Sequence, residues 1–456
     1  MRTVAKIGIS LITAILALLL IGYLLIHTFI NPKRYQEQIK HMFYAKTQQH
    51  LQIKGDMLLH FFPWVGLSMT NVLISNPPPI QVQPFAEIGN IELQLNILAL
   101  LRGEFDLDKI SLNNLTVNFI RQSDEENNHT TVANLLPIET HQAAQTIMLS
   151  TSQAQHIQAI KDKEEEQENI KHYIDIDQLN INHATLNWLD QKTGKMIRLK
   201  NFNLMATNLS ANKSGTLQAN FNIESNEPLT AAEMPFSNNK LRSEISGSFL
   251  LNKNTNIPTY NTVLFIKQLD IAPLINLYQE KKNFQLTGLL TGKINAKSSG
   301  DSMNAIKQNL VAHSTLALDN GTLTGLNLDQ LIQQINILKN IPTLQTKPLN
   351  TSLRYNKITG SFNIENEKLN NSDLRIIGND ISGSGHGTLN LSNHMLNYEL
   401  TLQMAQSILP LNIPITLNVT GPINAPNTTI HIASIGTKIL ERDFLKQLGK
   451  QFKNKP

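Results

Sequence analysis

The sequence contains no cysteine, few aromatic residues and few charged residues for its length. The absence of cysteine among 456 residues excludes disulfides, thiolate metal sites and cysteine nucleophiles. Aromatic residues make up 6% and charged residues 16%, whereas Asn, Thr, Ser, Leu and Ile are abundant. That mixture suits many half-buried strands better than the compact core of an enzyme. The length allows about two to four domains, or one elongated one.

Motifs of known chemistry are also missing. The chain has no H-E-x-x-H, Walker or G-x-G-x-x-G sequence. The string ISGSGHG at 381–387 lacks the spacing of a nucleophile elbow, and its glycines are better explained as sites where a strand bends. Asp175 and Asp177 could pair as acid and base, but on an alternating strand they more simply face water. We therefore expect no enzyme, no catalytic residue, no cofactor and no metal site.

The net charge of +4 is localised rather than spread over the chain. Residues 437–456 hold six Lys or Arg residues and two acidic ones, which leaves the rest close to neutral. The charge therefore gives no reason to expect a nucleic-acid partner. The acidic run at 164–168 has no His or Asp at ligand spacing, so we interpret it as solvated rather than metal-binding.

One long apolar run stands out, from Ile7 to Ile30, with 24 residues and no Asp, Glu, Lys or Arg. About 20 such residues cross a bilayer as a helix, so the run predicts a single transmembrane anchor. A cleaved signal peptide is the alternative, but the run is longer than usual and no small-x-small cleavage site follows. Basic residues flank both ends, so charge leaves the orientation open.

The rest of the chain shows mostly a period of two. Asn31 and Pro32 begin an amphipathic helix to about Lys46, and alternation then follows in short strands separated by Asn and Gly turns. Residues 107–120 alternate with a parity slip at Asn113–Asn114, which predicts a bulge. Asp319–Asn320–Gly321 predicts a hairpin turn. Helices are expected at 270–280, capped by Asp270, at 329–338 and at the C-terminus.

These patterns predict a mainly β protein with a few helices. The fold expected is a transmembrane helix followed by an elongated, twisted antiparallel β-groove that short amphipathic helices close. We divide the chain into the following segments: 1–31, stub and anchor; 32–122, N-terminal helix and β region; 123–172, linker or exposed helix; 173–310, middle β region; 311–436, C-terminal β region; 437–456, basic amphipathic helix.

Each strand has one aliphatic face and one face rich in Asn, Thr and Lys. Periodicity alone favours a closed sandwich core. The functional alternative is an open sheet whose aliphatic face receives lipid acyl chains, because each methylene removed from water gains about 0.8 kcal/mol. The candidate positions for such a groove are Ile91, Leu93, Leu95, Leu112, Val117, Phe119, Leu353, Tyr355, Phe362 and Leu400.

Several stretches at both ends of the chain form specific motifs. They are Asn31-Pro32-Lys33-Arg34-Tyr35, Gly55-Asp56-Met57, Phe62-Pro63-Trp64-Val65-Gly66-Leu67, Asn76-Pro77, Pro84-Phe85-Ala86, Leu100-Leu101-Arg102-Gly103-Glu104, Leu269-Asp270-Ile271-Ala272-Pro273-Leu274, Asp319-Asn320-Gly321 followed by Gly325-Leu326-Asn327-Leu328-Asp329, and the strands from Thr351 to Leu391. In these motifs the chain resembles the AsmA family of bacterial envelope proteins. The positions that carry the resemblance most clearly are Pro32, Arg34, Tyr35, Gly55, Asp56, Pro63, Trp64 and Gly66. Residues 123–172 match no part of the family pattern.

The resemblance implies an inner-membrane protein with its bulk in the periplasm. It also implies a β-groove related to bridge-like lipid-transfer proteins, and a role in lipid homeostasis and biogenesis of the outer membrane. The expected partners are phospholipid, the inner membrane and other envelope proteins. An assembly factor that binds outer-membrane proteins by strand addition is the alternative. The basic C-terminal helix offers candidate membrane-surface positions at Leu440, Arg442, Phe444, Leu445, Lys446 and Lys450.

Overall fold

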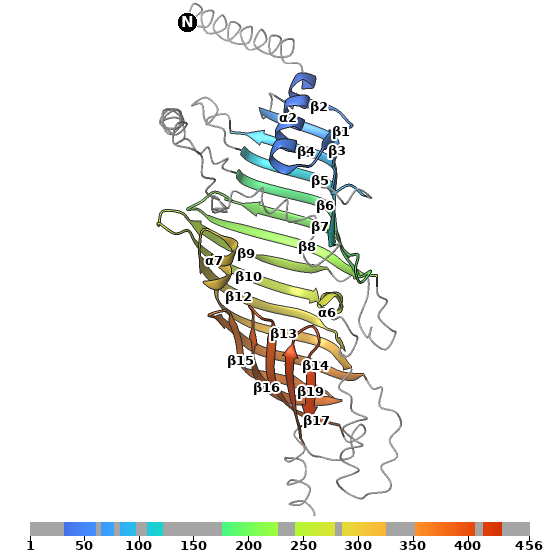
Figure 1. Ribbon diagram of the computed structural model, residues 1–456, viewed down its shortest axis with the longest axis vertical. Helices are drawn as coiled ribbons and strands as arrows, with labels where there is room; N and C mark the ends of the chain where they lie inside the picture. Colours follow the sequence, from blue (N-terminus) through green and yellow to red (C-terminus); the bar gives the residue numbers. More distant parts are fainter. Residues whose placement is uncertain are drawn as a thin grey trace, which may run out of the picture. The chain divides into compact units, whose positions relative to one another are not determined.

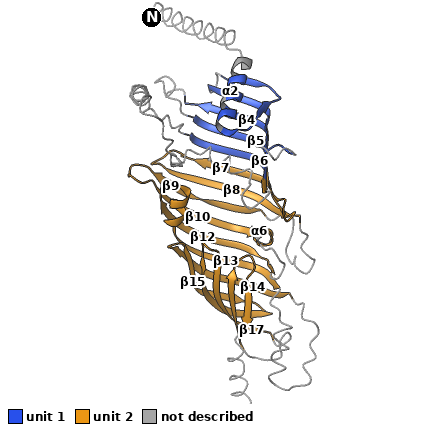
Figure 2. Cartoon of the chain, in the orientation of Figure 1, with its two compact units in different colours: residues 1–119, 125–184 blue, residues 120–124, 185–456 orange. Residues whose placement is uncertain are grey.

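The computed structural model describes residues 32–60, 65–76, 83–96, 107–121, 176–226, 242–278, 285–324, 352–405 and 414–430. The described residues form 19 strands and three helices (Figure 1). They divide into two compact units, residues 1–119 with 125–184, and residues 120–124 with 185–456 (Figure 2). The chain is therefore mainly β with few helices, as the alternation predicts.

Unit 1 contains one helix and an antiparallel sheet. Helix α2 (Pro32–Thr47) is followed by β1 (Leu51–Ile53), β2 (Met57–His60), β3 (Val65–Ile74), β4 (Ala86–Leu95) and β5 (Leu107–Arg121), whose last residues belong to unit 2. Both β1 and β2 pair with β3, which pairs with β4, and β4 pairs with β5. Strand β6 (Ile176–Asp190) begins in unit 1, where Asn182 Nδ2 donates to Asn113 Oδ1 at 2.9 Å.

Unit 2 is a succession of antiparallel strands. They are β7 (Met196–Thr207), β8 (Ser214–Ser225), β9 (Ser243–Asn252), β10 (Thr259–Asp270), β11 (Gln285–Leu286), β12 (Leu289–Ser299), β13 (Val311–Thr324), β14 (Leu353–Glu365), β15 (Lys368–Ile377), β16 (Ile381–Asn390), β17 (Met395–Met404), β18 (Ile415–Pro422) and β19 (Asn427–Ile430). From β7 on, each strand pairs with the next, except that β10 pairs with β12 and β11 pairs with β13. The pairings recorded for the described strands are all antiparallel, as expected.

In several strands a single residue with a left-handed backbone shifts the alternation of side chains between the two faces by one position. Asn71, Asn114, Asn201, Gln268 and Asn320 have φ between 49° and 53°. An ordinary strand sends successive side chains to opposite faces, so a slip of one residue would turn the following apolar residues to the wrong side. At the left-handed residue the alternation restarts. The slip predicted at Asn113–Asn114 is confirmed by the left-handed φ of Asn114.

The slips keep pairs of large side chains on one face although the two members are three positions apart in the sequence. Met69 and Val72 flank Asn71, and Leu112 and Leu115 flank Asn114. In β7 and β10 the slip also inserts an extra residue, because the register shifts between Lys200 and Asn203 and between Ile266 and Leu269. Such bulges bend a strand and increase its twist.

Three predicted features of the described residues can be compared directly. Helix α2 follows the predicted bounds, and α6 (Ala272–Tyr278) is capped as predicted, because Ala272 N donates to Asp270 Oδ1 at 3.1 Å. The hairpin predicted at 319–321 is wrong. Strand β13 runs through these residues, since the left-handed Asn320 produces a kink rather than a reversal of the chain.

One helix was missed, and several predictions cannot be compared. Helix α7 (Met303–Gln308) begins at Ser302, whose hydroxyl accepts from Ala305 N, and this short cap was the available signal. No helix among the described residues is long and apolar enough to cross a membrane. The run 7–30, the segment 123–172 and the helices expected at 329–338 and 437–456 lie outside the described residues.

The glycines of β16 leave space that large side chains of the neighbouring strand β17 occupy. A Cβ at Gly383, Gly385 or Gly387 would come within 3.0 Å of atoms of β17, including the side chains of Leu402, Leu400 and Tyr398. These side chains are the register partners of the three glycines. The ISGSGHG string is therefore a strand with space on one face, in agreement with the structural interpretation of its sequence.

The left-handed residues provide a test of the fold. Asn114 is exposed, so its backbone conformation matters more than its packing. We predict that Asn114→Val lowers the free energy of unfolding by about 1–2 kcal/mol, because a β-branched residue resists the left-handed conformation. Asn114→Gly should change it by less than about 1 kcal/mol. Urea unfolding of the full chain measures the free energy of unfolding of both variants. Equal losses in the two variants would contradict a requirement for the left-handed conformation at Asn114.

Candidate functional site

The register places the aliphatic side chains of unit 1 on a single face. Ile91 pairs with both Met69 and Leu112, and Leu93 pairs with Leu67 and Ile110. Beyond the slips, Ile88 pairs with Val72 and Leu115. Direct partners on neighbouring strands point to the same side of a sheet. Rows of large apolar side chains therefore cross β3, β4 and β5 on one side.

The same pattern runs through unit 2. One row crosses five strands through Leu217, Gly247, Leu264, Ile294 and Ser314, each the direct partner of the next. A parallel row contains Ala219, Ile245, Ile266, Gly292 and Leu316. We call the side of the unit 2 strands that carries these rows the apolar face.

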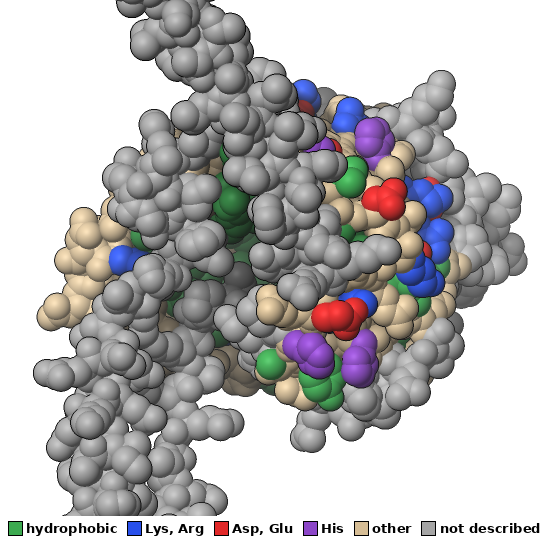
Figure 3. Space-filling view, turned by 90° about the horizontal axis from the view of Figure 1, so that it is seen from above, with side chains coloured by type: hydrophobic (Ala, Val, Ile, Leu, Met, Phe, Trp, Pro, Cys, Tyr) green, Lys and Arg blue, Asp and Glu red, His purple; other side chains and the backbone are tan. Residues whose placement is uncertain are grey.

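The opposite side of the same strands is polar. On β12 it carries Lys293, Asn295 and Lys297, all exposed. Lys293 lies over the ring of its partner Phe265, with Nζ 5.5 Å from the ring centroid. In the view from above, hydrophobic side chains are visible within a hollow, and most of the charged and His side chains that can be seen lie to the right of it (Figure 3). On β12 the charged side chains thus lie on the side opposite the apolar face.

In the described part of unit 2, the middle of the apolar face is only partly buried. The large apolar side chains that β9, β10 and β12 place on it are all partly exposed: Ile245, Phe249, Leu251, Leu264, Ile266 and Ile294. None of the fully buried hydrophobic residues comes from these three strands. We call this middle part the open section. Apolar surface left accessible over several adjacent strands commonly marks a binding groove or an interaction site.

The far part of the apolar face is closed. Leu353, Leu402, Ile415 and Leu417 are at most 1% exposed and belong to one core cluster. The cluster draws on strands from β13 to β18, which cross the view at a different angle from β9 and β10 (Figure 1). We call it the closed section. The buried side chains of the closed section pack against one another, so they offer no accessible surface to a ligand.

Polar groups around the closed section form hydrogen bonds within the protein. Tyr355 Oη donates to Thr287 O, and Tyr398 Oη donates to Asn371 Oδ1. Burial raises the pKa of Tyr398 to about 12, with a smaller contribution from the charge of Asp373, and burial also raises the pKa of Tyr355. Both hydroxyls therefore remain protonated and act as donors at neutral pH. They stabilise the closed core and do not suggest acid–base chemistry.

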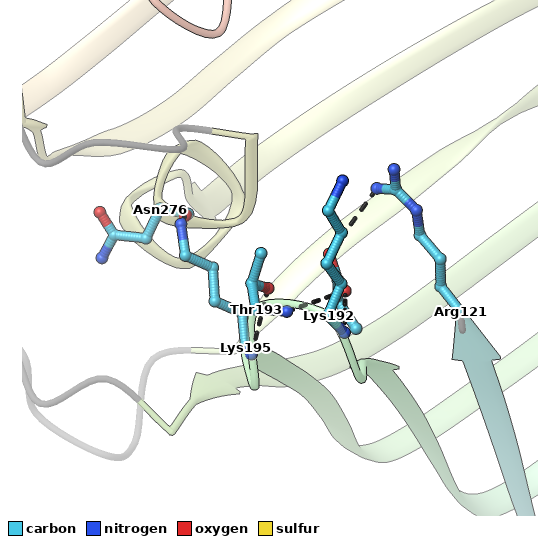
Figure 4. Close-up of polar contacts among 6 residues, drawn as sticks. Arg121, Lys192, Thr193, Lys195 and Asn276 are labelled. Atoms are coloured by element: carbon cyan, nitrogen blue, oxygen red, sulfur yellow. Dashed lines mark hydrogen bonds and ion pairs between the residues drawn. The ribbon is translucent and has the colours of Figure 1, made fainter. Parts of the chain in front are cut away.

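Helix α6 borders the apolar face at one rim. It contacts β7, β8 and β11, and Ile271 just before it packs against the closed section. Lys195, in the turn between β6 and β7, donates from Nζ to Asn276 O of the helix at 2.6 Å (Figure 4). Asp190 holds this turn by accepting from Lys192 N and Thr193 N. Burial raises the pKa of the capping Asp270. The helix is thus fixed at both ends.

The candidate groove positions fall into two groups. Leu353 and Tyr355 are buried in the closed section, and Val117 is buried in unit 1. The others remain partly exposed: Ile91, Leu93, Leu95, Leu112, Phe119, Phe362 and Leu400. Those of unit 1 form a group on β4 and β5, while Phe362 and Leu400 lie on β14 and β17 of unit 2. The period of two in the sequence did not predict which of the candidate positions are buried and which are accessible.

The open section itself was not among the candidates. Its signal along β10 was weak, because Leu264 and Ile266 alternate with the apolar residues Val263 and Phe265 rather than with polar ones. Alternation also occurs in the closed section, so it could not indicate which strands remain accessible. Only the burial of each side chain distinguishes the two sections.

The family-motif positions of unit 1 have structural roles. A Cβ at Gly55 would lie 2.2 Å from Thr70 Oγ1 and 2.7 Å from Thr70 O, so this position requires glycine. Asp56 follows it, and its N–H donates to Thr70 Oγ1 at 2.9 Å. Gly66 pairs with His60 and Gln94. Pro32, Arg34 and Tyr35 lie in the first turn of α2, whereas Pro63, Trp64 and all six C-terminal membrane-surface positions lie outside the described residues.

Truncation of a leucine in each section tests their difference. We predict that Leu402→Ala lowers the free energy of unfolding by about 2–5 kcal/mol, because it leaves an enclosed cavity. Leu264→Ala should cost about 1 kcal/mol, since solvent already reaches this side chain. Both residues belong to unit 2, so one denaturant titration compares them. A Leu264→Ala cost as large as that of Leu402→Ala would show that the open section is ordinary core.

Comparisons with known proteins agree with the motifs. A comparison with curated proteins found no match. The sequence model of the AsmA family matches residues 1–264, which is more than half of the chain and reaches from the N-terminus into β10. The match includes the motif positions around Gly55 and much of the strand pattern described above. The protein therefore belongs to the AsmA family.

Proposed function

We propose that this protein carries phospholipid acyl chains on the apolar face of its sheet and thereby supports lipid homeostasis and biogenesis of the outer membrane. The observation that supports this most directly is the open section, where six large apolar side chains on three adjacent strands remain partly exposed. Membership of the AsmA family is consistent with an envelope function.

The energetics favour an acyl chain as the occupant. A chain lying across several strands would bury many methylenes, each contributing about 0.8 kcal/mol. Gly247 and Gly292 lie among the larger residues of the rows, so the surface is not uniformly filled. The open section places no Lys, Arg, Asp or Glu on this face. Such a surface selects for hydrocarbon and not for a particular headgroup.

The proposal includes a location. An anchor at residues 7–30 would attach the chain to the inner membrane, with the strands in the periplasm, and phospholipid, the inner membrane and other envelope proteins as partners. We propose no catalytic step. In the described part of the chain, no group of three His, Asp or Glu side chains is arranged to hold a metal ion.

Photo-crosslinking on two phenylalanines tests lipid binding. Phe249 lies on the apolar face, and Phe265 lies on the polar face of the neighbouring strand and is 48% exposed. We predict that a benzophenone amino acid at position 249, irradiated in bacterial cells, forms adducts with the mass of phospholipid. The same group at position 265 should form few or none.

Position 265 is the control for crosslinking that results only from general exposure to the membrane or to detergent. Equal lipid adducts at positions 249 and 265 would contradict a specific apolar groove. Adducts at 249 with proteins and not with lipids would instead favour the alternative, an assembly factor that binds other chains. A benzophenone amino acid at position 402 should form no adduct with lipids or with proteins, because Leu402 is 0% exposed.

Reporter fusions test the location. A reporter active only in the periplasm, fused after Pro456, should be active, and one active only in the cytoplasm should be silent. The reverse result would contradict the envelope function as a whole, because the apolar face could then not meet lipids between the two membranes.

A further inference from the structure

Unit 1 contains a cavity whose lining residues all belong to this unit. It has a volume of about 450 Å³ and lies where the end of α2 meets the ends of β1 and β3. This volume is typical of a small-molecule site. Its lining includes Tyr44, Gln48, His50, Gln52, Ser75 and Gln83.

The lining combines apolar and polar side chains and contains no Lys, Arg, Asp or Glu. A phosphate or carboxylate ligand would find no cationic side chain, and a metal ion would find no carboxylate. Three Gln side chains and Ser75 instead offer neutral donors and acceptors. Ser75 Oγ accepts from His50 N at 2.8 Å, so its own proton remains available for a ligand. The chemistry therefore favours an uncharged ligand with many hydroxyl or amide groups.

An aromatic pair forms one wall. The rings of Tyr44 and His50 stack with centroids 4.7 Å apart and an interplanar angle of 25°. Because the two rings occupy each other's inner faces, they leave no slot for a flat aromatic ligand between them. Tyr44 is nevertheless 41% exposed. Its accessible surface could pack against the C–H face of a saturated ring.

Gln48 is an unusual residue for its position. Its N–H donates to Tyr44 O at 2.8 Å, and its φ is 57°, so it ends α2 in the left-handed conformation. Glycine or asparagine usually occupies this position, because a longer side chain is strained there. Non-glycine residues in this conformation occur preferentially at functional sites. Here the side chain of the strained residue lines the cavity.

We propose that this cavity binds the ring of an uncharged sugar. Tyr44 would contact its C–H face, and the amides of Gln48, Gln52 and Gln83 would bond its hydroxyl or amide groups. The sugar could belong to a free saccharide or to the headgroup of a glycolipid, since both present the same ring. This site is independent of the proposed acyl-chain groove, which lies in unit 2.

The test uses the full chain in a detergent without a sugar headgroup, because a glycosidic detergent would compete. Two probes are titrated and followed by ligand-observed NMR and calorimetry: the neutral trisaccharide of N-acetylglucosamine, and vesicles with or without glucosyl-diacylglycerol. Saturable trisaccharide binding indicates a free saccharide site. Binding restricted to the glucosyl vesicles indicates a glycolipid headgroup. Absence of both would overturn the proposal.

Two variants with one control separate binding from folding. Gln48→Gly should leave the Tm unchanged or higher, because glycine relieves the strained φ, yet weaken binding about fivefold through loss of a hydrogen bond. Tyr44→Leu should weaken binding about tenfold. Glu367→Gly, at another left-handed residue with φ 55°, should affect the Tm similarly without changing binding. If Gln48→Gly binds as tightly as the original chain, the cavity is not the site.

Discussion

The architecture depends on keeping most of the large aliphatic side chains on one side of the strands. A β-strand alternates strictly, so over 10 to 15 residues a single slip would turn half of these side chains into water. The chain avoids this with left-handed residues such as Asn71, Asn114 and Asn320, which restart the alternation without ending the strand. Asn is suited to this role because its short polar side chain tolerates the left-handed region.

A continuous apolar face is unfavourable in water, so it must be buried against other apolar groups. Unit 2 covers only part of it. The closed section from β13 to β18 buries Leu353, Leu402 and Leu417 almost completely, while β9, β10 and β12 leave theirs partly exposed. Within one unit, the same side-chain pattern therefore gives both a stable core and an accessible surface. The core supplies the stability that allows the neighbouring surface to remain uncovered.

Much of this fold could be predicted from the sequence. The period of two gave the strands, the slip at Asn114 was visible as a parity change, and Asp270 marked the start of α6. The hairpin expected at Asn320 failed because Asp-Asn-Gly also suits a kink within a strand. The accessible part of the apolar face could not be predicted, because periodicity shows which side chains share a face and does not show whether other residues pack on that face. The partial exposure of Leu264 and the burial of Leu402 are seen only in the folded chain. The cavity beside Tyr44 was likewise invisible, because its lining comes from three separate segments.

The central claim is that the open section holds lipid, and native mass spectrometry of the purified full chain tests it most directly. The measurement compares the original chain with a double variant, Leu264→Asp with Ile294→Asp, whose folding is first verified by circular dichroism. These side chains are partly exposed, so the charges should be tolerated by the fold better than in a closed core. The account predicts phospholipid bound to the original chain and a clear loss of it from the folded double variant. Equal lipid occupancy of the two proteins would contradict the account.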